Sequence, residues 1–186
     1  MKYAQTMDYW DSLSTILSRL DYGVNISNKQ FMPLQPGEAA PDFSLKDQNG
    51  KIRSNKRISS KYLILFFYPK DNTPGCTAQA CSFKENYESL KRLGAQVLGV
   101  SSDSQDSHRD FATNYNLEFP LLCDEGGALR ISFGLNKVFG IIPSRVTYII
   151  NRRGIIEHVF SNLLDGPAHV SDALSFLSEI QTKGNK

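Results

Sequence analysis

Two cysteines that follow a proline-glycine turn are the residues of this chain whose types and spacing best suit chemistry. Cys76 comes directly after Pro74 and Gly75, and Cys81 follows five positions later on a segment with helical spacing. The first turn of a helix has unpaired backbone N–H groups and the positive end of the helix dipole, and both stabilise an anion. The thiolate is the reactive form of cysteine. We therefore predict that Cys76 is a nucleophile, the alternative being a buried structural cysteine.

The segments on either side of this turn should hold the first cysteine in place. Residues 62–68 form an unbroken apolar block, which is typical of a buried strand. Apolar residues then recur at helical spacing over residues 76–93, and Gly94 stands where a left-handed residue often ends a helix. We expect a strand, a turn and a helix, in that order.

The segment Tyr-Pro-Lys-Asp-Asn-Thr-Pro-Gly-Cys-Thr-Ala-Gln-Ala-Cys, residues 68–81, resembles the active site of the peroxiredoxins. The second cysteine five residues after the first is typical of the peroxiredoxin Q, or bacterioferritin-comigratory, subgroup. The resemblance covers roughly residues 35–180. It implies an α/β protein with a thioredoxin-like fold, in which a central mixed β-sheet has helices on both faces. It also implies a thiol-dependent peroxidase that reduces hydrogen peroxide and alkyl hydroperoxides.

The resemblance gives roles to five residues. Cys76 would attack the peroxide and become a sulfenic acid, which Cys81 would resolve as an intramolecular disulfide. Thr73 would orient the thiolate and hold the peroxide, and Pro69 would shield the sulfur from water. Arg145, just before a β-branched strand, would face the cysteine and stabilise both the thiolate and the departing oxygen. The plainer interpretations are an N-cap or turn threonine, a strand-ending proline and a solvated surface arginine.

The spacing of the two cysteines sets a geometric condition on any bond between them. Five helical residues turn by about 140° and rise by about 7.5 Å, which separates the two Cα atoms by about 8 to 9 Å. Disulfides rarely join Cα atoms more than about 7 Å apart. Cys76 and Cys81 therefore cannot bond in an intact helix, and we expect its first turns to unwind once the sulfenic acid forms. The alternative for Cys81 is a small core residue.

Two positions depart from the pattern of the subgroup. Gln79 stands where the signature has glutamate, so a hydrogen bond or ion pair that the family makes there is in doubt. The change removes a carboxylate and adds two amide donors, and the loss of a negative charge near Cys76 favours the thiolate. Cys123 occupies a place where the family often has serine. We interpret Cys123 as structural or incidental, the alternative being a competing resolving thiol.

The composition excludes several classes of protein. The chain has 186 residues, enough for one domain with a core, and its net charge of +2 is too small to indicate binding to nucleic acid or to a membrane. No segment approaches the roughly 20 apolar residues that a membrane span needs. Three cysteines do not make a disulfide framework. Asp8, Asp11 and Asp21 interrupt the first thirty residues, which argues against a signal or transit peptide, so we expect a cytoplasmic protein.

The chain divides into an N-terminal extension, residues 1–34, and a peroxiredoxin-like domain, residues 35–186. Apolar residues with helical spacing over residues 8–20 predict an amphipathic helix, followed by a linker rich in asparagine and glycine. This helix packs on its own domain or contacts a partner or a second subunit. A monomer and a homodimer both remain open.

The other expected elements follow from local patterns of apolar, turn and capping residues. They are a strand over 40–45, a tight turn at Asn49-Gly50, a strand over 95–100, a helix from Ser104 or Ser107 to Tyr115, a short helix over 124–133, strands over 146–150 and 155–160 joined at residues 152–154, and a last helix over 169–180.

Thiol peroxidase activity is the leading hypothesis, with the enzyme recycled by thioredoxin or a similar dithiol and with no haem, flavin or metal cofactor. The alternative is a peroxide-sensing redox adaptor that acts through a protein partner. The absence of a Cys-x-x-Cys motif disfavours a thioredoxin-type disulfide reductase. Metal binding is a weak interpretation, because His108, His158 and His169 lack the spacing of metal ligands. We interpret His108, with Arg109 and Asp110, as an exposed helix start.

Overall fold

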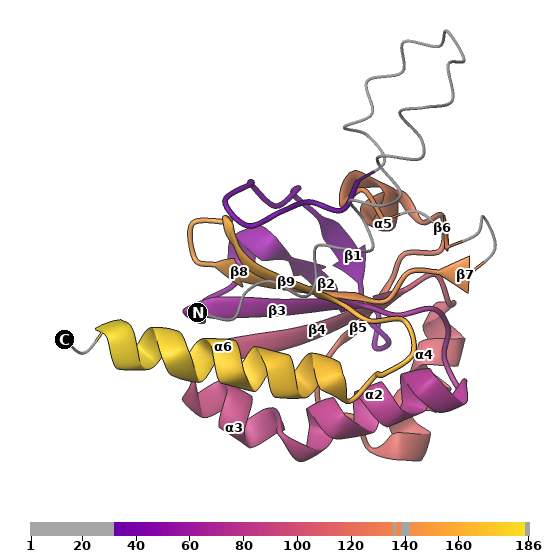
Figure 1. Ribbon diagram of the computed structural model, residues 1–186. Coiled ribbons are helices and arrows are strands. Elements are labelled where there is room, and N and C mark those ends of the chain that lie inside the picture. The colour runs from indigo at the N-terminus through magenta and orange to yellow at the C-terminus, as the bar shows by residue number, and fades with distance from the viewer. Residues whose placement is uncertain (1–31, 136, 139–141, 185–186) are drawn as a thin grey trace, which may run out of the picture.

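A mixed five-stranded sheet lies at the centre of the computed structural model, which describes residues 32–135, 137–138 and 142–184 (Figure 1). The strand order is β5-β4-β3-β8-β9. β3 pairs in parallel with β4, and β4 with β5, whereas β8 runs antiparallel to both β3 and β9. The bounds are β3 Tyr62–Phe67, β4 Ala95–Ser101, β5 Leu121–Cys123, β8 Val146–Asn151 and β9 Ile156–Ser161. The predicted helix over residues 8–20 lies outside the described residues.

The central strand β3 is buried along its whole length, as its unbroken apolar sequence predicts. Side chains alternate between the two faces of a strand. Ile64 and Phe66 therefore join one core cluster, whereas Leu65 and Phe67 join the other. With core on both sides, the end of β3 is a rigid point from which the next loop starts.

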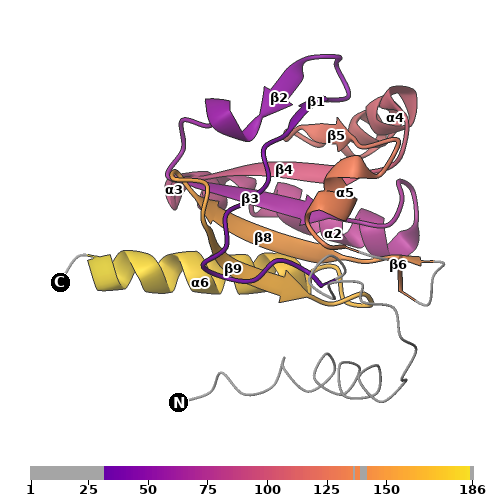
Figure 2. The ribbon, with the colours of Figure 1, turned by 90° about the horizontal axis from the view of Figure 1, so that it is seen from above.

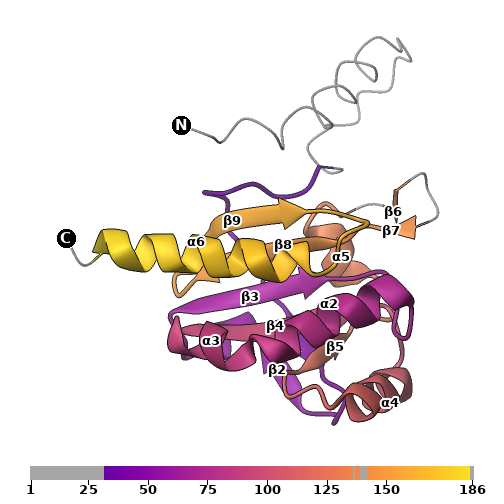
Figure 3. The same cartoon turned by 60° about the horizontal axis from the view of Figure 1, so that its bottom comes forward.

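Helices cover both faces of the sheet, as predicted, although very unequally (Figures 2 and 3). One face packs against α2, α3, α4 and α6, and the other against the short α5 and a hairpin of β1 and β2. The bounds are α2 Pro74–Glu85, α3 Tyr87–Arg92, α4 Gln105–Tyr115, α5 Ala128–Ser132, α6 Ala168–Gly184, β1 Ser44–Lys46 and β2 Ile52–Ser54. A 3₁₀ turn, η2, and a small strand pair complete the described elements, with bounds η2 Asn55–Arg57, β6 Lys137–Val138 and β7 Ile142–Pro143.

The helix predicted over residues 76–93 is in fact two helices, α2 and α3, which Asn86 separates. The side-chain amide of Asn86 donates to the Ser82 carbonyl at 2.9 Å, in competition with the backbone. Asparagine disfavours helix interiors for this reason. The left-handed residue predicted after this helical segment is confirmed, since Gly94 has a φ of 78°.

Other boundaries moved by a few residues for local reasons. The strand predicted over residues 40–45 is regular only at Ser44–Lys46, after Pro41, which has no backbone N–H to give to a ladder. The short helix predicted over 124–133 is confined to Ala128–Ser132, because the Asp124 carboxylate accepts from two of its backbone N–H groups. Strand β5 was not predicted from the sequence. The other strands and helices predicted within the described residues are present, with ends no more than four residues from those expected.

The sheet register brings distant segments to one edge. Phe67, the last residue of β3, pairs with Val146, the first residue of β8. Arg145 therefore lies next to the loop that follows β3, and parallel β4 ends at the same edge. Within the described part of the chain, no helix is both long and apolar enough to cross a membrane.

His169, near the start of α6, contacts both β8 and the loop that follows β9. Its Nε2 lies 2.9 Å from the Asn162 carbonyl oxygen, which can only accept, and its Nδ1 lies 2.8 Å from the Thr147 hydroxyl. The ring satisfies both partners in its neutral form. Burial, together with the charge of Arg145, lowers the pKa of His169 to about 4.

This depressed pKa predicts a loss of stability in mild acid. An unfolded histidine titrates near 6.5, so between about pH 6.5 and pH 4 the native state binds fewer protons than the unfolded state. Stability therefore falls as the pH drops through this window. We expect His169 to remove about 2 kcal/mol from the free energy of unfolding between pH 7 and pH 5, measured by urea titration. His169→Gln should show a smaller fall, and equal falls would contradict the prediction.

Candidate active site

Cys76 lies in the first turn of α2, where the sequence predicts it. Thr73 is the N-cap residue of this helix, and Pro74 occupies its first position, where the missing N–H of proline has no cost. The Cys76 side chain is almost fully buried, with 2% of the residue exposed. The thiol therefore lies at the positive end of the helix dipole, in a region that excludes water.

A buried guanidinium faces the sulfur. Arg145 Nη2 lies 3.6 Å from Cys76 Sγ, and Nη1 donates to Gln79 Oε1 at 2.7 Å. Arg145 Nε donates to the Leu163 carbonyl at 3.0 Å, so Gln79 and Leu163 together fix the orientation of the guanidinium. Only 4% of Arg145 is exposed, which excludes the solvated surface arginine that was its plainer interpretation.

Two glycines permit these close contacts. A Cβ atom on Gly75 would lie 3.1 Å from Arg145 Nη2. A Cβ atom on Gly166, in the loop before α6, would lie 2.6 Å from the Gly75 carbonyl oxygen and 2.8 Å from Gln79 Cβ. Any side chain at position 166 would therefore push this loop away from the first turn of α2.

Gln79 keeps a contact with the arginine but supplies no charge. Its Oε1 accepts from Arg145, whereas its Nε2 is buried with no hydrogen-bond partner among the described residues. Gln79 lies three positions after Cys76, on the same face of the helix. A neutral amide leaves the positive charge of the guanidinium available to the sulfur, which a carboxylate would partly neutralise.

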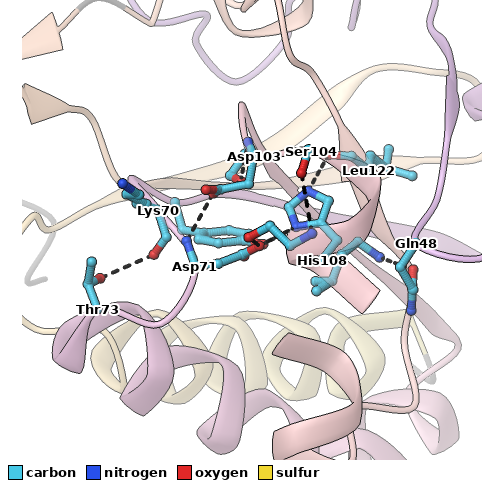
Figure 4. A network of polar contacts seen from close by, with 12 residues as sticks. Gln48, Lys70, Asp71, Thr73, Asp103, Ser104, His108 and Leu122 are labelled. Atoms are coloured by element: carbon cyan, nitrogen blue, oxygen red, sulfur yellow. Dashed lines mark hydrogen bonds and ion pairs between the residues drawn. The ribbon is translucent and has the colours of Figure 1, made fainter. Parts of the chain in front are cut away.

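Thr73 and Pro69 flank the site on the loop between β3 and α2. The Thr73 hydroxyl donates to the Lys70 carbonyl at 3.2 Å and does not cap the helix (Figure 4). It keeps its oxygen lone pairs for another donor. Pro69 is half-buried, two residues after the end of β3.

The other two cysteines differ in their surroundings. Cys81 is half-buried on α2, on the same unbroken helix as Cys76, and both thiols are free. Cys123 ends β5, where burial and the nearby Glu125 carboxylate raise the pKa of its thiol to about 11. The thiolate of Cys123 is therefore scarce at neutral pH, which agrees with a structural interpretation.

A second buried arginine, Arg130, supports the site and was not predicted from the sequence. Arg130 donates from Nη1 to the Ser144 carbonyl at 2.7 Å and from Nη2 to the Tyr68 carbonyl at 2.8 Å. It thus joins the end of β3 to the residue before Arg145. Burial lowers the pKa of Arg130 to about 10, so it stays charged at neutral pH. No local pattern marks this arginine, because its partners come from distant segments.

A buried polar cluster around Asp71, in the loop between β3 and α2, was also not predicted from the sequence. The Asp71 carboxylate accepts from the Tyr68 hydroxyl at 2.7 Å and from the Ser107 hydroxyl at 2.8 Å, and lies 2.8 Å from His108 Nδ1. The interpretation of His108 as an exposed helix start is wrong, because α4 buries its positions 108, 111 and 112 as one face. Burial, and then Asp71, raise the pKa of Tyr68 well above its ordinary value, so the phenol remains a donor.

Residues 36–159 match the AhpC/TSA family. Among curated relatives, the chloroplastic peroxiredoxin Q of Populus jackii is 39% identical over 170 residues, which is 91% of this chain and 79% of that protein. The chloroplastic peroxiredoxin Q of Arabidopsis thaliana is 44% identical over 148 residues, which is 79% of this chain and 68% of that protein.

Solved structures agree in fold. The peroxidoxin BcpB of Mycobacterium tuberculosis gives a TM-score of 0.74 at 31% identity, covering 79% of this chain and 98% of that one. The bacterioferritin comigratory protein of Xanthomonas campestris, whose alkyl peroxide reduction activity has been studied structurally, gives 0.68 at 27% identity over 74% and 90% of the two chains. The chain therefore belongs to the AhpC/TSA family, within its peroxiredoxin Q subgroup, and is a thiol peroxidase with a thioredoxin-like fold.

The neutral residue at position 79 gives a test of the electrostatics of the site. Gln79→Glu would pair a carboxylate with Arg145 and weaken its stabilisation of the sulfur. We expect alkylation of Cys76 by iodoacetamide at pH 7 to slow by about three- to tenfold, because less thiolate is present. Gln181→Glu, near the far end of α6 from His169, adds the same charge and is the control. Alkylation of Gln79→Glu at or above the rate of the unmodified protein would contradict the argument.

Proposed function

We propose that Cys76 is the peroxidatic cysteine of this thiol peroxidase. Its sulfur attacks one oxygen of a hydroperoxide, forming an S–O bond as the O–O bond breaks. The other oxygen takes up a proton and leaves as water or an alcohol, and the sulfur is oxidised to a sulfenic acid. The observation that carries this proposal is the 3.6 Å contact between Arg145 Nη2 and Cys76 Sγ at the start of α2.

Arg145 acts on both the nucleophile and the leaving group. Negative charge moves during the reaction from the sulfur to the departing oxygen, and a donor already aimed at this point stabilises it at each stage. The guanidinium is always charged. Gln79 and the Leu163 carbonyl hold it in place, so it needs little reorganisation as the charge develops.

Thr73 and Pro69 complete the site as the resemblance implies. The Thr73 hydroxyl donates to Lys70, so its oxygen is free to accept a hydrogen bond from the O–H of a bound peroxide. Pro69 offers no N–H and covers the sulfur with an apolar ring. Both residues act by placing the peroxide oxygen in line with the Cys76 sulfur.

Cys81 resolves the sulfenic acid in this proposal. Its thiolate attacks the oxidised sulfur of Cys76, an S–S bond forms, and the hydroxyl group leaves as water after taking up a proton. The Cα atoms of an intact helix are about 8 to 9 Å apart at this spacing, so the first turns of α2 must unwind. Unwinding breaks the bond between Arg145 and Gln79 and exposes Ala80, which is buried in the folded helix.

The remaining roles extend the proposal beyond the site. Thioredoxin or a similar dithiol reduces the disulfide by exchange. The proposed division into an N-terminal extension, residues 1–34, and a domain, residues 35–186, rests on the sequence, and Leu34 already packs against the core of the domain. The proposed protein is a monomer or a homodimer. We keep the cytoplasm as the proposed compartment, although the two peroxiredoxin Q relatives are chloroplastic; residues 1–31, which bear on this question, lie outside the described residues.

Serine substitutions at the three cysteines separate their roles. We expect Cys76→Ser to lose peroxidase activity with thioredoxin by about a thousandfold or more, because the nucleophile is absent. Cys81→Ser should consume one equivalent of peroxide and then stall, whereas Cys123→Ser should turn over normally. A coupled assay that follows NADPH oxidation measures all three. An active Cys76→Ser protein would refute the mechanism.

Turnover also distinguishes an enzyme from a peroxide-sensing adaptor. The proposed enzyme should consume many equivalents of hydrogen peroxide per chain when a dithiol reductant is present, and peptide mapping of the oxidised protein should show a Cys76–Cys81 disulfide. A sensor would stop after one equivalent even with the reductant. A link from Cys76 to Cys123 in the oxidised protein would rule out Cys81 as the resolving residue.

A further inference from the structure

A buried carboxylate, Asp71, lies in the loop that leads from β3 to the helix of Cys76 (Figure 4). Asp71 is 4% exposed, yet its two oxygens have three hydrogen-bond partners. Oδ1 accepts from the Tyr68 hydroxyl at 2.7 Å, and Oδ2 accepts from the Ser107 hydroxyl at 2.8 Å. The third partner is His108, whose Nδ1 lies 2.8 Å from Oδ2. The carboxylate thereby connects the loop to Tyr68, the residue after β3, and to α4.

His108 contacts both the loop before α2 and strand β5. Its ring is fully buried, and its Nε2 lies 3.2 Å from the Leu122 carbonyl oxygen of β5. Both partners are acceptors, and an imidazole with its proton on Nδ1 donates to the Asp71 carboxylate. The imidazole therefore fixes Asp71 relative to the sheet edge as well as to its own helix.

The backbone of the loop is fixed at the same place. The Asp71 N–H donates to Asp103 Oδ2 at 2.9 Å. Asn72 then turns the chain with a left-handed φ of 58°, a conformation that asparagine tolerates better than most residues. Thr73 follows, with its hydroxyl on the Lys70 carbonyl. The position of Thr73 therefore depends directly on where Asp71 is held.

A metal ion is the other ligand chemistry that this cluster suggests. One ligand atom each from Asp71, Asp103 and His108 lie within 4.8 Å of one another. Hydrogen bonds account for these contacts, however. The Asp71 oxygens have three partners, and Asp103 Oδ2 accepts from both the Ser101 hydroxyl and the Asp71 N–H. The donors already match the acceptors, which favours a positioning network over a cation site.

We propose that His108 is a positioning residue for the peroxidase reaction, through its hydrogen bond to Asp71. This inference rests on the proposed function, since it adds a residue to the same site. The bond sets the loop that carries Pro69 and Thr73 at the distance from Cys76 that peroxide requires. A displacement of about 1 Å in such a site costs up to about a hundredfold in rate. Simple alkylation needs only an accessible thiolate, so it should depend far less on this loop.

Two amide variants separate the two contacts of the imidazole. In His108→Asn the amide nitrogen takes roughly the place of Nδ1 and can still donate to Asp71. In His108→Gln it takes roughly the place of Nε2 and can still donate to the Leu122 carbonyl. Each variant loses one contact of the imidazole and keeps a polar side chain, so we expect both to lose a similar amount of folding stability. Arg109→Ala, on the exposed side of the same helix, is the control for a substitution in α4 outside the buried cluster.

The readouts are the second-order rate constant of the reduced protein with hydrogen peroxide and the rate of alkylation by iodoacetamide. We expect His108→Gln to lose about tenfold or more in the peroxide rate while its alkylation stays within about twofold. His108→Asn should recover most of the peroxide rate, and Arg109→Ala should match the unmodified protein. Circular dichroism and urea unfolding check that each variant is folded.

Three outcomes would overturn the positioning role. They are equal loss of peroxide rate in both amide variants, a parallel loss of alkylation, and a normal peroxide rate in His108→Gln. Should His108→Gln fail to fold, Tyr68→Phe removes a different donor to Asp71, and it should show the same selective loss if the carboxylate positions the loop. A normal peroxide rate in Tyr68→Phe would then overturn the role. An unmodified protein that does not react with peroxide would instead refute the proposed function.

Discussion

The contact between a buried guanidinium and a buried thiol is the interaction on which the rest of this site depends. A charged group inside a protein is tolerated only when its donors have partners. Arg145 meets this condition with Cys76, Gln79 and the Leu163 carbonyl, which come from α2 and from the loop after β9. The sheet, α2 and the loop after β9 must therefore all be in their native positions before the arginine can be buried with its partners. The same arrangement leaves Nη2 of the guanidinium aimed at the sulfur.

The mixed sheet makes this arrangement possible. Parallel β3 and β4 end at the same edge, and antiparallel β8 begins there, so three segments far apart in the sequence meet beside one loop. The carboxyl ends of parallel strands are common positions for functional residues in α/β folds. Arg130 strengthens this edge by joining the Tyr68 and Ser144 carbonyls, where the strand ladder has ended. Burial on both faces keeps the strands rigid, so that small differences in loop position can matter.

The sequence predicts those parts of the site that depend on local signals. The apolar block before the turn and the Pro74-Gly75 pair predict a strand and a helix start, and both were found where expected. The contact of Arg145 with the thiol joins positions 69 residues apart, so only the family resemblance indicated it. His108 was misjudged because polar residues are usually exposed, and its burial depends on an acceptor from another segment. The break at Asn86 likewise depends on how its side chain competes with the backbone.

The interruption at Asn86 also limits how much of the molecule has to be rebuilt in each proposed cycle. Helices melt cooperatively, and an isolated segment as short as α2 is only marginally stable in water. In one continuous helix, melting at Cys76 would spread toward the part that Leu90 fastens to the core. Here α3 starts anew with its own hydrogen bonds, and Leu90 is fully buried. The break at Asn86 therefore confines unwinding to α2, and an oxidised enzyme needs to refold only this short helix to return to its resting state.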